Sequence, residues 1–331
     1  MDRILLGHGS GGKLMHELIR THFGPAFGIQ GSGDSALVQV PSHRLAYTTD
    51  SYVVTPLFFP GGNIGDLAVN GTVNDLAVFG AVPLFLTAGF VIEEGFLLSD
   101  LKAIISSMAA AAKRSGVTIV AGDTKVVNRG KADGIFINTS GIGVVPEGRE
   151  ISGSRIKAGD RIIISGEIGS HGVAVMSERN GLTFEPPIVS DSCALNGLVR
   201  TMYEVTAEIH FMRDPTRGGL ATTLKEAALE SGLCARIKEP LLPVPQGVRG
   251  ACSLLGLDPL YVANEGVLIA IVEASNAEAV VSAMRQHEFG LHSAIIGEIL
   301  ESPVGGVLLE TAIGGTRIID MLAGEQLPRI C

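Results

Sequence analysis

Hydrophobic and polar positions alternate with two different periods along residues 35–145. Short apolar stretches rich in β-branched and aromatic residues predict strands, and longer stretches with an apolar stripe at helical spacing predict helices. The expected strands are 35–40, 44–54, 84–92, 118–127 and 135–145, and the expected helices are 64–81 and 98–116. A chain that alternates strands and helices in this way is typical of an α/β domain.

The apolar pattern stops at residues 146–160, a polar, turn-rich segment that marks a candidate domain boundary. A second unit of strands and helices follows it. Its expected strands are 161–166, 266–272 and, as the last one, 305–311. One expected helix begins near 170, and three others lie near 194–207, 219–231 and 276–288. A proline-rich loop is expected at 185–192. The sequence therefore predicts an α/β (α+β) protein with a glycine-rich segment at 1–34, domains at 35–150 and 151–321, and a C-terminal tail at 322–331.

The tail ends in LPRIC, with Cys331 as the last residue. Gly324 and Pro328 argue against a helix that reaches the end of the chain. Ten residues can extend to roughly 33 Å. We therefore expect a flexible tail that can carry the Cys331 thiol from solvent to a buried site and back.

Composition narrows the possible functions of the 331 residues. Lys and Arg number 25 against 34 Asp and Glu, and the net charge of −9 disfavours nucleic acid as a partner. The four cysteines form no CxxC pair, so we expect neither a zinc site nor a disulfide framework, and a cytoplasmic location is the simplest. The N-terminus lacks a signal-peptide pattern, and residues 76–92, although apolar, are divided by Gly80, Pro83 and Gly89. We expect this stretch to be the end of a buried helix followed by a buried strand, with no membrane span.

The segment GHGSGGKL, residues 7–14, has the GxxxxGK spacing of a Walker A loop. Leu14 stands where a P-loop needs Ser or Thr to hold Mg²⁺, which disfavours a true P-loop. Two interpretations stay open. The segment is either a disordered start of the chain or a mobile lid whose backbone N–H groups, at Gly9, Gly11 and Gly12, close over a phosphate.

A polar stripe interrupts the expected helix at 64–81. Asp66, Asn70 and Asn74 are spaced at i, i+4 and i+8, so they lie on one face of a helix that is otherwise rich in Ala, Val and Gly. A polar stripe on a buried helix needs partners, and we count Asp66 and Asn70 among the candidate nucleotide-binding residues. Taken alone, an Asp in such a position is more typical of a cap or a turn.

Further carboxylates lie where other elements are expected to end. They are Asp50 in TTDSYVV, Asp75 in NDLAVFG and Asp123 in VAGDTKVV. Hard oxygen donors that converge from several elements suit Mg²⁺, which binds through a few carboxylates together with nucleotide phosphates. Lys125 lies two residues after Asp123, on the same side of the expected strand, where it could neutralise a phosphoryl group or move a proton.

Two motifs of the second unit add polar groups. FMRDPTRGGLA contains Asp214 and paired glycines beside Arg217, which is either a plain turn before a helix or an anion site. DPLYVANEGV contains Glu265, which the local pattern alone would place in a surface turn.

Seven motifs, taken together, resemble one family. They are HGSGG, DSYVVTPLFFPGGNIGDLAVNGTVNDLAVFGA, GDTKVV, INTSGIG, RDPTRGGL, DPLYVANEG and the terminal PRIC. In this order, over nearly the whole chain, they resemble the HypE hydrogenase maturation factors, the carbamoyl dehydratases of the aminoimidazole ribonucleotide synthetase-like superfamily. The resemblance implies a two-domain fold and a homodimer whose N-terminal sheets form a shared barrel. It also implies a C-terminal α/β sandwich, with ATP and Mg²⁺ in the cleft between the domains.

The same resemblance implies a reaction for the terminal thiol. The carbamoyltransferase HypF would place a carboxamide on Cys331, and ATP-dependent dehydration would convert it to a thiocyanate. The cyano group would then pass to iron on a HypC–HypD complex, as a ligand of the [NiFe] hydrogenase centre. The matching positions in this chain are Asp50, Asp75 and Asp123 for Mg-ATP, and Lys125 and Glu265 near the carboxamide. Which of the last two acts as the base stays open.

Two alternatives remain at this point. A kinase or synthetase of the same superfamily would act on a free small molecule, although the glycine segment lacks the reactive Cys or selenocysteine usual in selenophosphate synthetase. A non-enzymatic thiol carrier would need only Cys331 and would not hydrolyse ATP.

Overall fold

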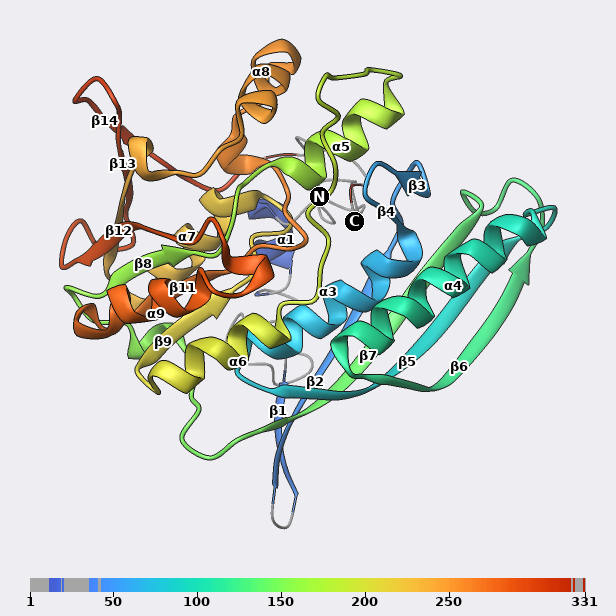
Figure 1. Ribbon diagram of the computed structural model, residues 1–331, viewed down its shortest axis with the longest axis horizontal. Coiled ribbons are helices and arrows are strands. Elements are labelled where there is room, and N and C mark those ends of the chain that lie inside the picture. Colours follow the sequence, from blue (N-terminus) through green and yellow to red (C-terminus); the bar gives the residue numbers. More distant parts are fainter. Residues whose placement is uncertain are drawn as a thin grey trace.

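The computed structural model describes residues 12–18, 20, 36–40, 43–322, 324 and 330. Two units lie side by side, each built on its own β-sheet (Figure 1). Helix α3 (Ile64–Val78) lies between them, because one side of it packs on the first sheet and another on α6 (Asn196–Val205) of the second unit.

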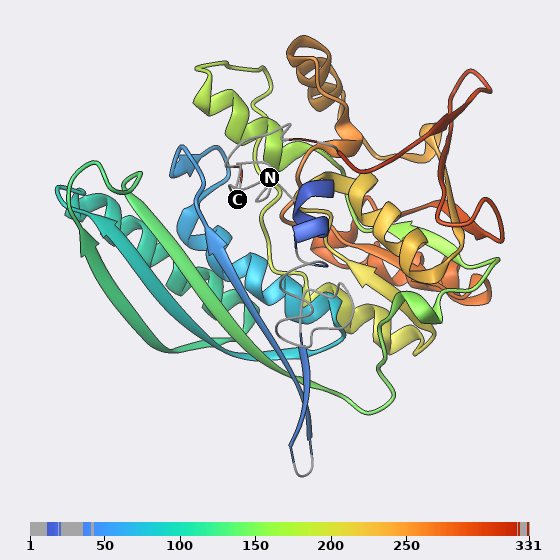
Figure 2. The same ribbon diagram turned by 180° about the vertical axis from the view of Figure 1, so that it is seen from behind.

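The first sheet has the strand order β1-β2-β7-β5-β6 and is antiparallel except for the β5/β6 pair, which α4 connects. Helices α3 and α4 cover one face, and among the described residues no helix covers the other, as the reverse view shows (Figure 2). The bounds of its elements are β1 Ala36–Val40, β2 His43–Tyr52, β5 Val82–Glu93, α4 Leu98–Ser115, β6 Thr118–Val127 and β7 Ile135–Val145, with a small β3–β4 hairpin at Phe58–Phe59 and Gly62–Asn63.

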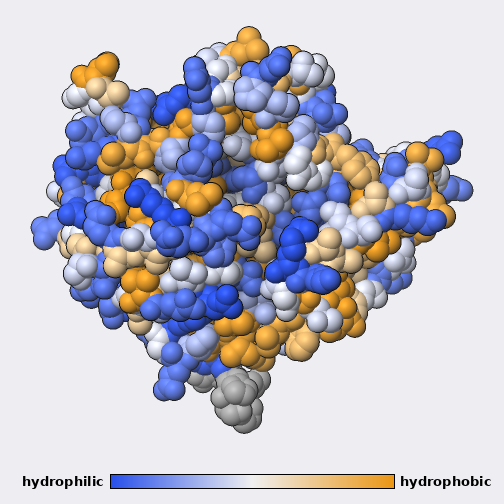
Figure 3. Space-filling view, viewed as in Figure 1, coloured by the Kyte–Doolittle hydropathy of each residue, from blue (hydrophilic) through white to orange (hydrophobic). Residues whose placement is uncertain are grey.

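Hydrophobic residues also reach the surface on the helix-bearing side of the first unit (Figure 3, at the right). Among them are Leu98 and Ile105 of α4, which are exposed.

Helix α3 is buried along almost its whole length because both units pack on it. Asn63 caps its start: its side chain accepts the Gly65 N–H at 2.8 Å, and the Asn63 N–H donates to Asp66 Oδ1 at 2.7 Å. Gly71 allows β2 to approach, since a Cβ at this position would lie 2.3 Å from the hydroxyl oxygen of Tyr52.

The second sheet has seven strands in the order β14-β13-β10-β12-β8-β11-β9. Helix α7 packs on one face, and α6 and α9 pack on the other. In β8 the side chains of Ile162 and Ile164 face α7 while Ile163 faces α6 and α9, so the three positions after Arg161 are apolar on both faces. The bounds are β8 Arg161–Ile164, α5 Ser170–Arg179, β9 Ile209–Arg213, α7 Gly219–Ser231, β10 Cys234–Lys238, α8 Gln246–Leu255, β11 Ile269–Val272, α9 Ala277–Met284, β12 Ala294–Leu300, β13 Val307–Glu310 and β14 Thr316–Ile318.

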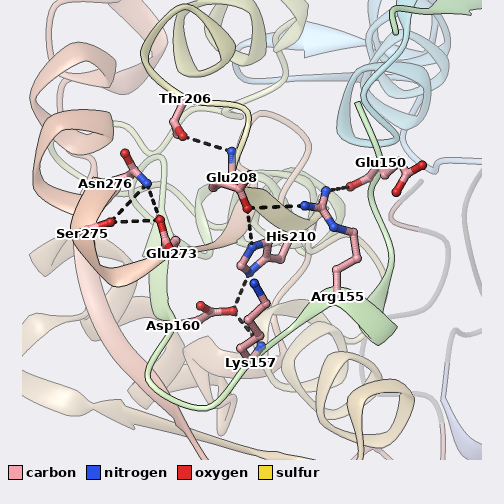
Figure 4. Close-up of polar contacts among 10 residues, drawn as sticks. All are labelled: Glu150, Arg155, Lys157, Asp160, Thr206, Glu208, His210, Glu273, Ser275 and Asn276. Atoms are coloured by element: carbon pink, nitrogen blue, oxygen red, sulfur yellow. Dashed lines mark hydrogen bonds and ion pairs between the residues drawn. The ribbon is translucent and has the colours of Figure 1, made fainter. Parts of the chain in front are cut away.

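A polar network fixes the linker between the two sheets (Figure 4). The buried ring of His210, on the edge strand β9, lies between Asp160 Oδ2 at 2.7 Å and Glu208 Oε2 at 3.2 Å. Arg155 pairs with Glu208 at 3.5 Å, and the Lys157 N–H donates to Asp160 Oδ2 at 2.8 Å. The linker is therefore tied to the second sheet.

The structure confirms the strands and helices expected within residues 35–145, including the division of residues 76–92 between α3 and β5. The expectation that the strand in this stretch is buried is wrong within one chain, because Leu84, Phe85 and Val91 of β5 are exposed. In the second unit the sequence pattern missed β9, β10, β12 and α8. The expectation that 305–311 holds the last strand is wrong, because β14 follows it. Among the described residues, no helix is both long and apolar enough to cross a membrane. The barrel of two copies and the domain limits at 35, 150 and 321 stay predictions.

Candidate active site between the two domains

Glu265 lies in the loop between η5 (Pro259–Tyr261) and β11, at the boundary between the two units, and is 2% exposed. Its backbone N–H donates to Asp191 Oδ1 at 3.3 Å, and the N–H of Gly266 donates to Asp191 Oδ2 at 3.2 Å. Glycine is needed at 266 because a Cβ there would lie 1.8 Å from the carbonyl oxygen of Asp191. The local pattern, which placed Glu265 in a surface turn, is wrong here because Asp191 accepts both N–H groups and holds the loop inside the protein.

The electrostatic environment of Glu265 favours its neutral form. Burial raises the pKa of the Glu265 carboxyl well above its ordinary value, and the carboxylates of Asp214, Asp191 and Asp50 raise it further. Arg217 acts in the opposite direction. Within the described part of the chain, Glu265 Oε1 has no hydrogen-bond partner. A buried carboxyl with a raised pKa and an unbonded oxygen is a candidate general acid or base.

Strand β2 brings groups of the first unit to the same place. Asp50 and Tyr52 are two residues apart and lie on one face of the strand, toward α3. Burial raises the pKa of Tyr52 well above its ordinary value, and Asp50, Asp75 and Glu265 raise it further, in that order. Carboxylates from both units therefore surround one buried phenol.

Two of the three predicted Mg²⁺ ligands lie on this face of the first sheet. Asp75 of α3 accepts a hydrogen bond from Thr48 Oγ1 of β2 at 2.9 Å, and Asp50 lies two residues beyond Thr48. Burial raises the pKa of Asp50, and the positive charge of Arg217 lowers it. A bound cation would lower this pKa in the same way and so favour the charged form of Asp50. Mg²⁺ needs only one or two protein carboxylates beside phosphates and water, which Asp50 and Asp75 fit. The described residues contain no group of three or more His, Cys, Asp or Glu side chains that could hold a metal ion alone.

Asp123 and Lys125 lie apart from this cluster. Four residues pair in one row across the first sheet: Ser51 of β2, Asn138 of β7, Gly89 of β5 and Asp123 of β6. Because successive residues of a strand point to opposite faces, Asp123 and Lys125 share the uncovered face with Ser51, and Asp50 points the other way. The β2 and β6 backbones are also three strand spacings apart, about 14 Å. Within one chain the structure does not bring Asp123 or Lys125 to Asp50 and Glu265, so their assigned roles stay predictions.

The polar stripe of α3 faces the second unit. Asp66 Oδ2 accepts a hydrogen bond from Ser192 Oγ at 3.4 Å, and Asn70 donates to the same hydroxyl at 3.1 Å. Asn74 donates to the carbonyl of Cys193 at 2.9 Å. The stripe thus binds the segment before α6, and Asp66 also accepts the backbone N–H of Asn63, the residue that caps α3. A nucleotide-binding role for Asp66 and Asn70 stays a prediction.

The C-terminal tail returns to the boundary between the units. Ile330 is 3% exposed and belongs to the same buried cluster as Phe59 and Ala263. Its carbonyl oxygen accepts a hydrogen bond from Nε2 of the fully buried His171 at 3.0 Å. Cys331, the predicted carrier of the substrate, lies outside the described residues, but its neighbour is held within the protein.

The glycine segment meets the start of this tail. The N–H of Lys13 donates to the carbonyl oxygen of Leu322 at 3.1 Å, and a Cβ on Gly12 would lie 2.5 Å from that oxygen. Gly9 and Gly11 lie outside the described residues. The prediction that this segment binds phosphate therefore stays untested, while its contact with the tail was not expected.

Sequence reasoning missed three residues of the site. Tyr52 stands within a recognised motif, but nothing in the motif marks it as buried among carboxylates. His171 opens a helix, and Asp191 lies in the proline-rich loop, where each looks like an ordinary cap or turn residue. Their partners are distant in sequence, so no local signal could have identified them.

Comparison with protein families gives two matches that together span most of the chain. Residues 32–145 match the N-terminal domain of AIR synthase related proteins, and residues 157–310 match the C-terminal domain. These matches confirm the predicted two-domain fold.

Curated relatives match over the full length. The carbamoyl dehydratase HypE of Bradyrhizobium diazoefficiens is 54% identical over 330 residues, covering 98% of this chain and 95% of the relative. The carbamoyl dehydratase HypE of Escherichia coli K12 is 43% identical over 339 residues, covering 100% of both.

Solved structures agree with these relatives. A HypE–HypF complex contains a chain that is 49% identical, with a TM-score of 0.87 over 92% of this chain and 99% of that chain. The hydrogenase maturation protein HypE in complex with ATP is 47% identical, with a TM-score of 0.85 over 99% of this chain and 100% of that chain. The chain therefore belongs to the carbamoyl dehydratase HypE family of hydrogenase maturation proteins, within the AIR synthase related superfamily.

Proposed function

We propose that the chain uses ATP to dehydrate an S-carboxamide on its own Cys331 to a thiocyanate, which supplies the cyanide ligand for the iron of [NiFe] hydrogenase. The observation that carries the proposal is the burial of Ile330 beside His171, one residue before the thiol. None of the three described thiols suits the role of substrate carrier. Cys234 and Cys252 are buried, and burial raises the pKa of Cys193 above its ordinary range.

The reaction needs ATP because the oxygen of an amide is a poor leaving group. Transfer of the γ-phosphoryl group to the carboxamide oxygen forms an O–P bond and releases ADP. Cleavage of the C–O bond then releases inorganic phosphate, and the nitrogen loses both hydrogens as protons, which leaves S–C≡N. In such a phosphoryl transfer the protein acts chiefly by positioning and by stabilising charge.

Glu265 is the base that we assign to the nitrogen protons. Once ionised, a carboxylate whose pKa is raised is a stronger base than an ordinary one, and Arg217, which lowers the pKa of Glu265, favours the ionised form that this role requires. Arg217, which lowers the pKa of both Glu265 and Asp50, is a cation near the site and would balance developing negative charge.

Asp50 and Asp75 are the side chains that would hold Mg²⁺. A bound Mg²⁺ would neutralise charge on the phosphate oxygens. Asp50 contributes from β2 and Asp75 from α3, so the ion would lie on the side of the first sheet that faces the second unit.

A homodimer is part of the proposal because Asp123 and Lys125 cannot reach Glu265 within one chain. The uncovered face of the first sheet carries exposed apolar side chains beside them: Tyr47 is 42%, Phe85 45% and Val91 36% exposed. Exposed apolar side chains on an uncovered sheet face favour association. A second copy packed on this face would cover these apolar side chains together with Asp123 and Lys125.

Two partner proteins complete the proposal. The relative of known structure in complex with HypF supports a carbamoyltransferase as the source of the carboxamide. A HypC–HypD complex is proposed as the acceptor of the cyano group. We propose a cytoplasmic location because Cys331 must stay a free thiol until it is loaded.

Intact-mass analysis of the full chain tests the function. The protein is incubated with the carbamoyltransferase and its substrates, first without and then with ATP. We expect one carbamoyl adduct that loses one water only when ATP is present, and no adduct on Cys331→Ala. An adduct on Cys193, Cys234 or Cys252, or a carbamoyl adduct that ATP leaves unchanged, would contradict the proposal.

A further inference from the structure

The last described residue of the tail is held in two ways. Its side chain, at Ile330, belongs to a buried apolar cluster that draws on both units. The members of this cluster include Val54 and Phe59 from the first unit and Val175 and Ala263 from the second. Its carbonyl oxygen meets Nε2 of His171 at 3.0 Å. An apolar contact and a directed hydrogen bond therefore act on a single residue.

The hydrogen bond defines the state of His171. A carbonyl oxygen can only accept, so Nε2 carries the hydrogen and Nδ1 is the acceptor, which takes the hydroxyl hydrogen of Ser190 at 2.8 Å. Burial lowers the pKa of His171 to about 4, which keeps the ring neutral near pH 7. The ring also makes an edge contact with Phe59, with centroids 5.4 Å apart. The imidazole is therefore held in one tautomer and one orientation.

The same region holds Glu265. The carboxylate of Asp191 accepts the backbone N–H of His171 and also those of Glu265 and Gly266. One carboxylate thus binds both the start of α5, which carries the tail contact, and the loop that carries the assigned base.

We propose that His171 is a positioning residue for the reaction: together with the apolar cluster around Ile330, it fixes the last peptide unit before Cys331 and so limits the distance between the thiol and Glu265. This inference rests on the proposed function, because it gives the contact a role in that reaction. Consecutive Cα atoms are about 3.8 Å apart, so holding Ile330 limits the distance of the Cys331 Cα from the His171 contact. A tail that is free over ten residues would sample a volume roughly 33 Å in radius.

The strength of these contacts suits a tail that must also leave. One buried Ile side chain and one neutral hydrogen bond favour the held tail over the released tail. They raise the equilibrium constant between the two by roughly one to three orders of magnitude, before the entropic cost of ordering the tail is subtracted. The tail can therefore dissociate for loading and return for dehydration.

Thiol accessibility tests the contact without ATP or partner proteins. The full-length chain is treated with iodoacetamide, and the alkylation rate of each cysteine is followed by peptide mass spectrometry. We expect Ile330→Asp and His171→Leu to raise the rate at Cys331 by roughly tenfold or more. His171→Gln, whose amide can still donate, should restore part of the protection. His292→Leu, at an exposed histidine, is the matched control and should leave the rate at its wild-type value.

Cys234 and Cys252 report on unfolding in the same experiment, because both are buried. If they react in His171→Leu, that variant has unfolded globally. The test of the tail contact then rests on Ile330→Asp, because this substitution lies at the end of the chain and not in the core. Equal Cys331 rates in wild type and Ile330→Asp, with Cys234 and Cys252 protected, would overturn the inference.

Single-turnover dehydration of the carbamoylated protein gives the second readout. We expect His171→Leu to load normally and to dehydrate at least tenfold more slowly, with partial rescue in His171→Gln. If the wild type dehydrates and His171→Leu keeps the wild-type rate, the positioning role is wrong while the proposed function stands. If the wild type fails to dehydrate but Cys331 shows the protection described, the proposed function fails and the tail contact stands.

Discussion

Asn74 of helix α3 donates a hydrogen bond from its side-chain amide to the backbone carbonyl of Glu265 at 3.1 Å. The same side chain accepts the N–H of Leu195 at 2.8 Å and donates to the carbonyl of Cys193 at 2.9 Å. Asn74 is completely buried, and all three partners belong to the second unit. One side chain of the first unit therefore fixes the position of the loop that carries Glu265.

Replacing Asn74 should damage both stability and activity. Asn74→Ala leaves buried carbonyl and N–H groups without partners, so we expect the free energy of unfolding to fall by about 3 kcal/mol. Dehydration should slow as well, because the Glu265 loop loses its support. Chemical denaturation and the intact-mass assay measure the two effects. Asn180→Ala, at an exposed asparagine, is the control and should change stability by less than about 0.5 kcal/mol. Equal stability of Asn74→Ala and the control would contradict this bridge.

Glu265→Gln separates chemistry from folding. The amide cannot take up a proton, so we expect dehydration to slow by roughly 10²- to 10⁴-fold while carbamoylation of Cys331 continues. Because burial and neighbouring carboxylates disfavour the charged form of Glu265, the neutral variant should be at least as stable as the wild type near pH 7. The exposed Glu278→Gln serves as the control. Dehydration at the wild-type rate in Glu265→Gln would remove it from the role of base.

Protonation of His171 should lower the folding stability in acid. The pKa of His171 is about 4 in the folded chain, below the ordinary 6.5, so the unfolded chain takes up the proton first as the pH falls. The contribution of this group to stability is present above pH 6.5 and is lost as the pH approaches 4, a change of roughly 3 kcal/mol. His171→Gln should therefore lose less stability than the wild type between pH 7 and 4.5 in denaturant titrations. Parallel acid profiles for the two proteins would contradict the depressed pKa.

Asp191 should act in the opposite direction. Burial raises its pKa from 3.8 to about 6, so its contribution to stability is complete below pH 3.8 and is lost as the pH rises through 6. We expect the stability of wild type relative to Asp191→Asn to fall by roughly 3 kcal/mol from pH 4 to pH 7. The measurement is the free energy of unfolding of both proteins at each pH. A difference that does not vary over this range would show that the carboxyl titrates normally.

Mixing two inactive variants tests whether a site is shared between copies. If the Lys125 of one copy serves the Glu265 of the other, Lys125→Ala and Glu265→Gln should each be inactive alone. Random mixing makes half of the dimers mixed, and each mixed dimer has one intact site of two, so about a quarter of the wild-type activity should return. An active Lys125→Ala variant, or no recovery in mixed dimers verified by mass, would show that the site does not combine these residues across copies.

The first sheet was predictable because its elements follow local periodicity. Strand β7 alternates buried and more exposed positions along its whole length, and α4 carries an apolar stripe. In the second unit β9 is buried at every position and only five residues long, so it offered no alternation by which a strand could be recognised.

The sequence by itself determined the chemical groups of the site: the carboxyl groups of Asp50, Asp75 and Glu265, and the thiol of Cys331. It also placed Asp123 and Lys125 on one side of a strand, because that depends only on a two-residue spacing. Only the tertiary structure decided that Asp123 and Lys125 lie on the uncovered face of the sheet, because the pairing register of the strands determines the face. Tertiary structure also decided that Glu265 is buried and that Ile330 meets His171, because these contacts join segments far apart in the chain.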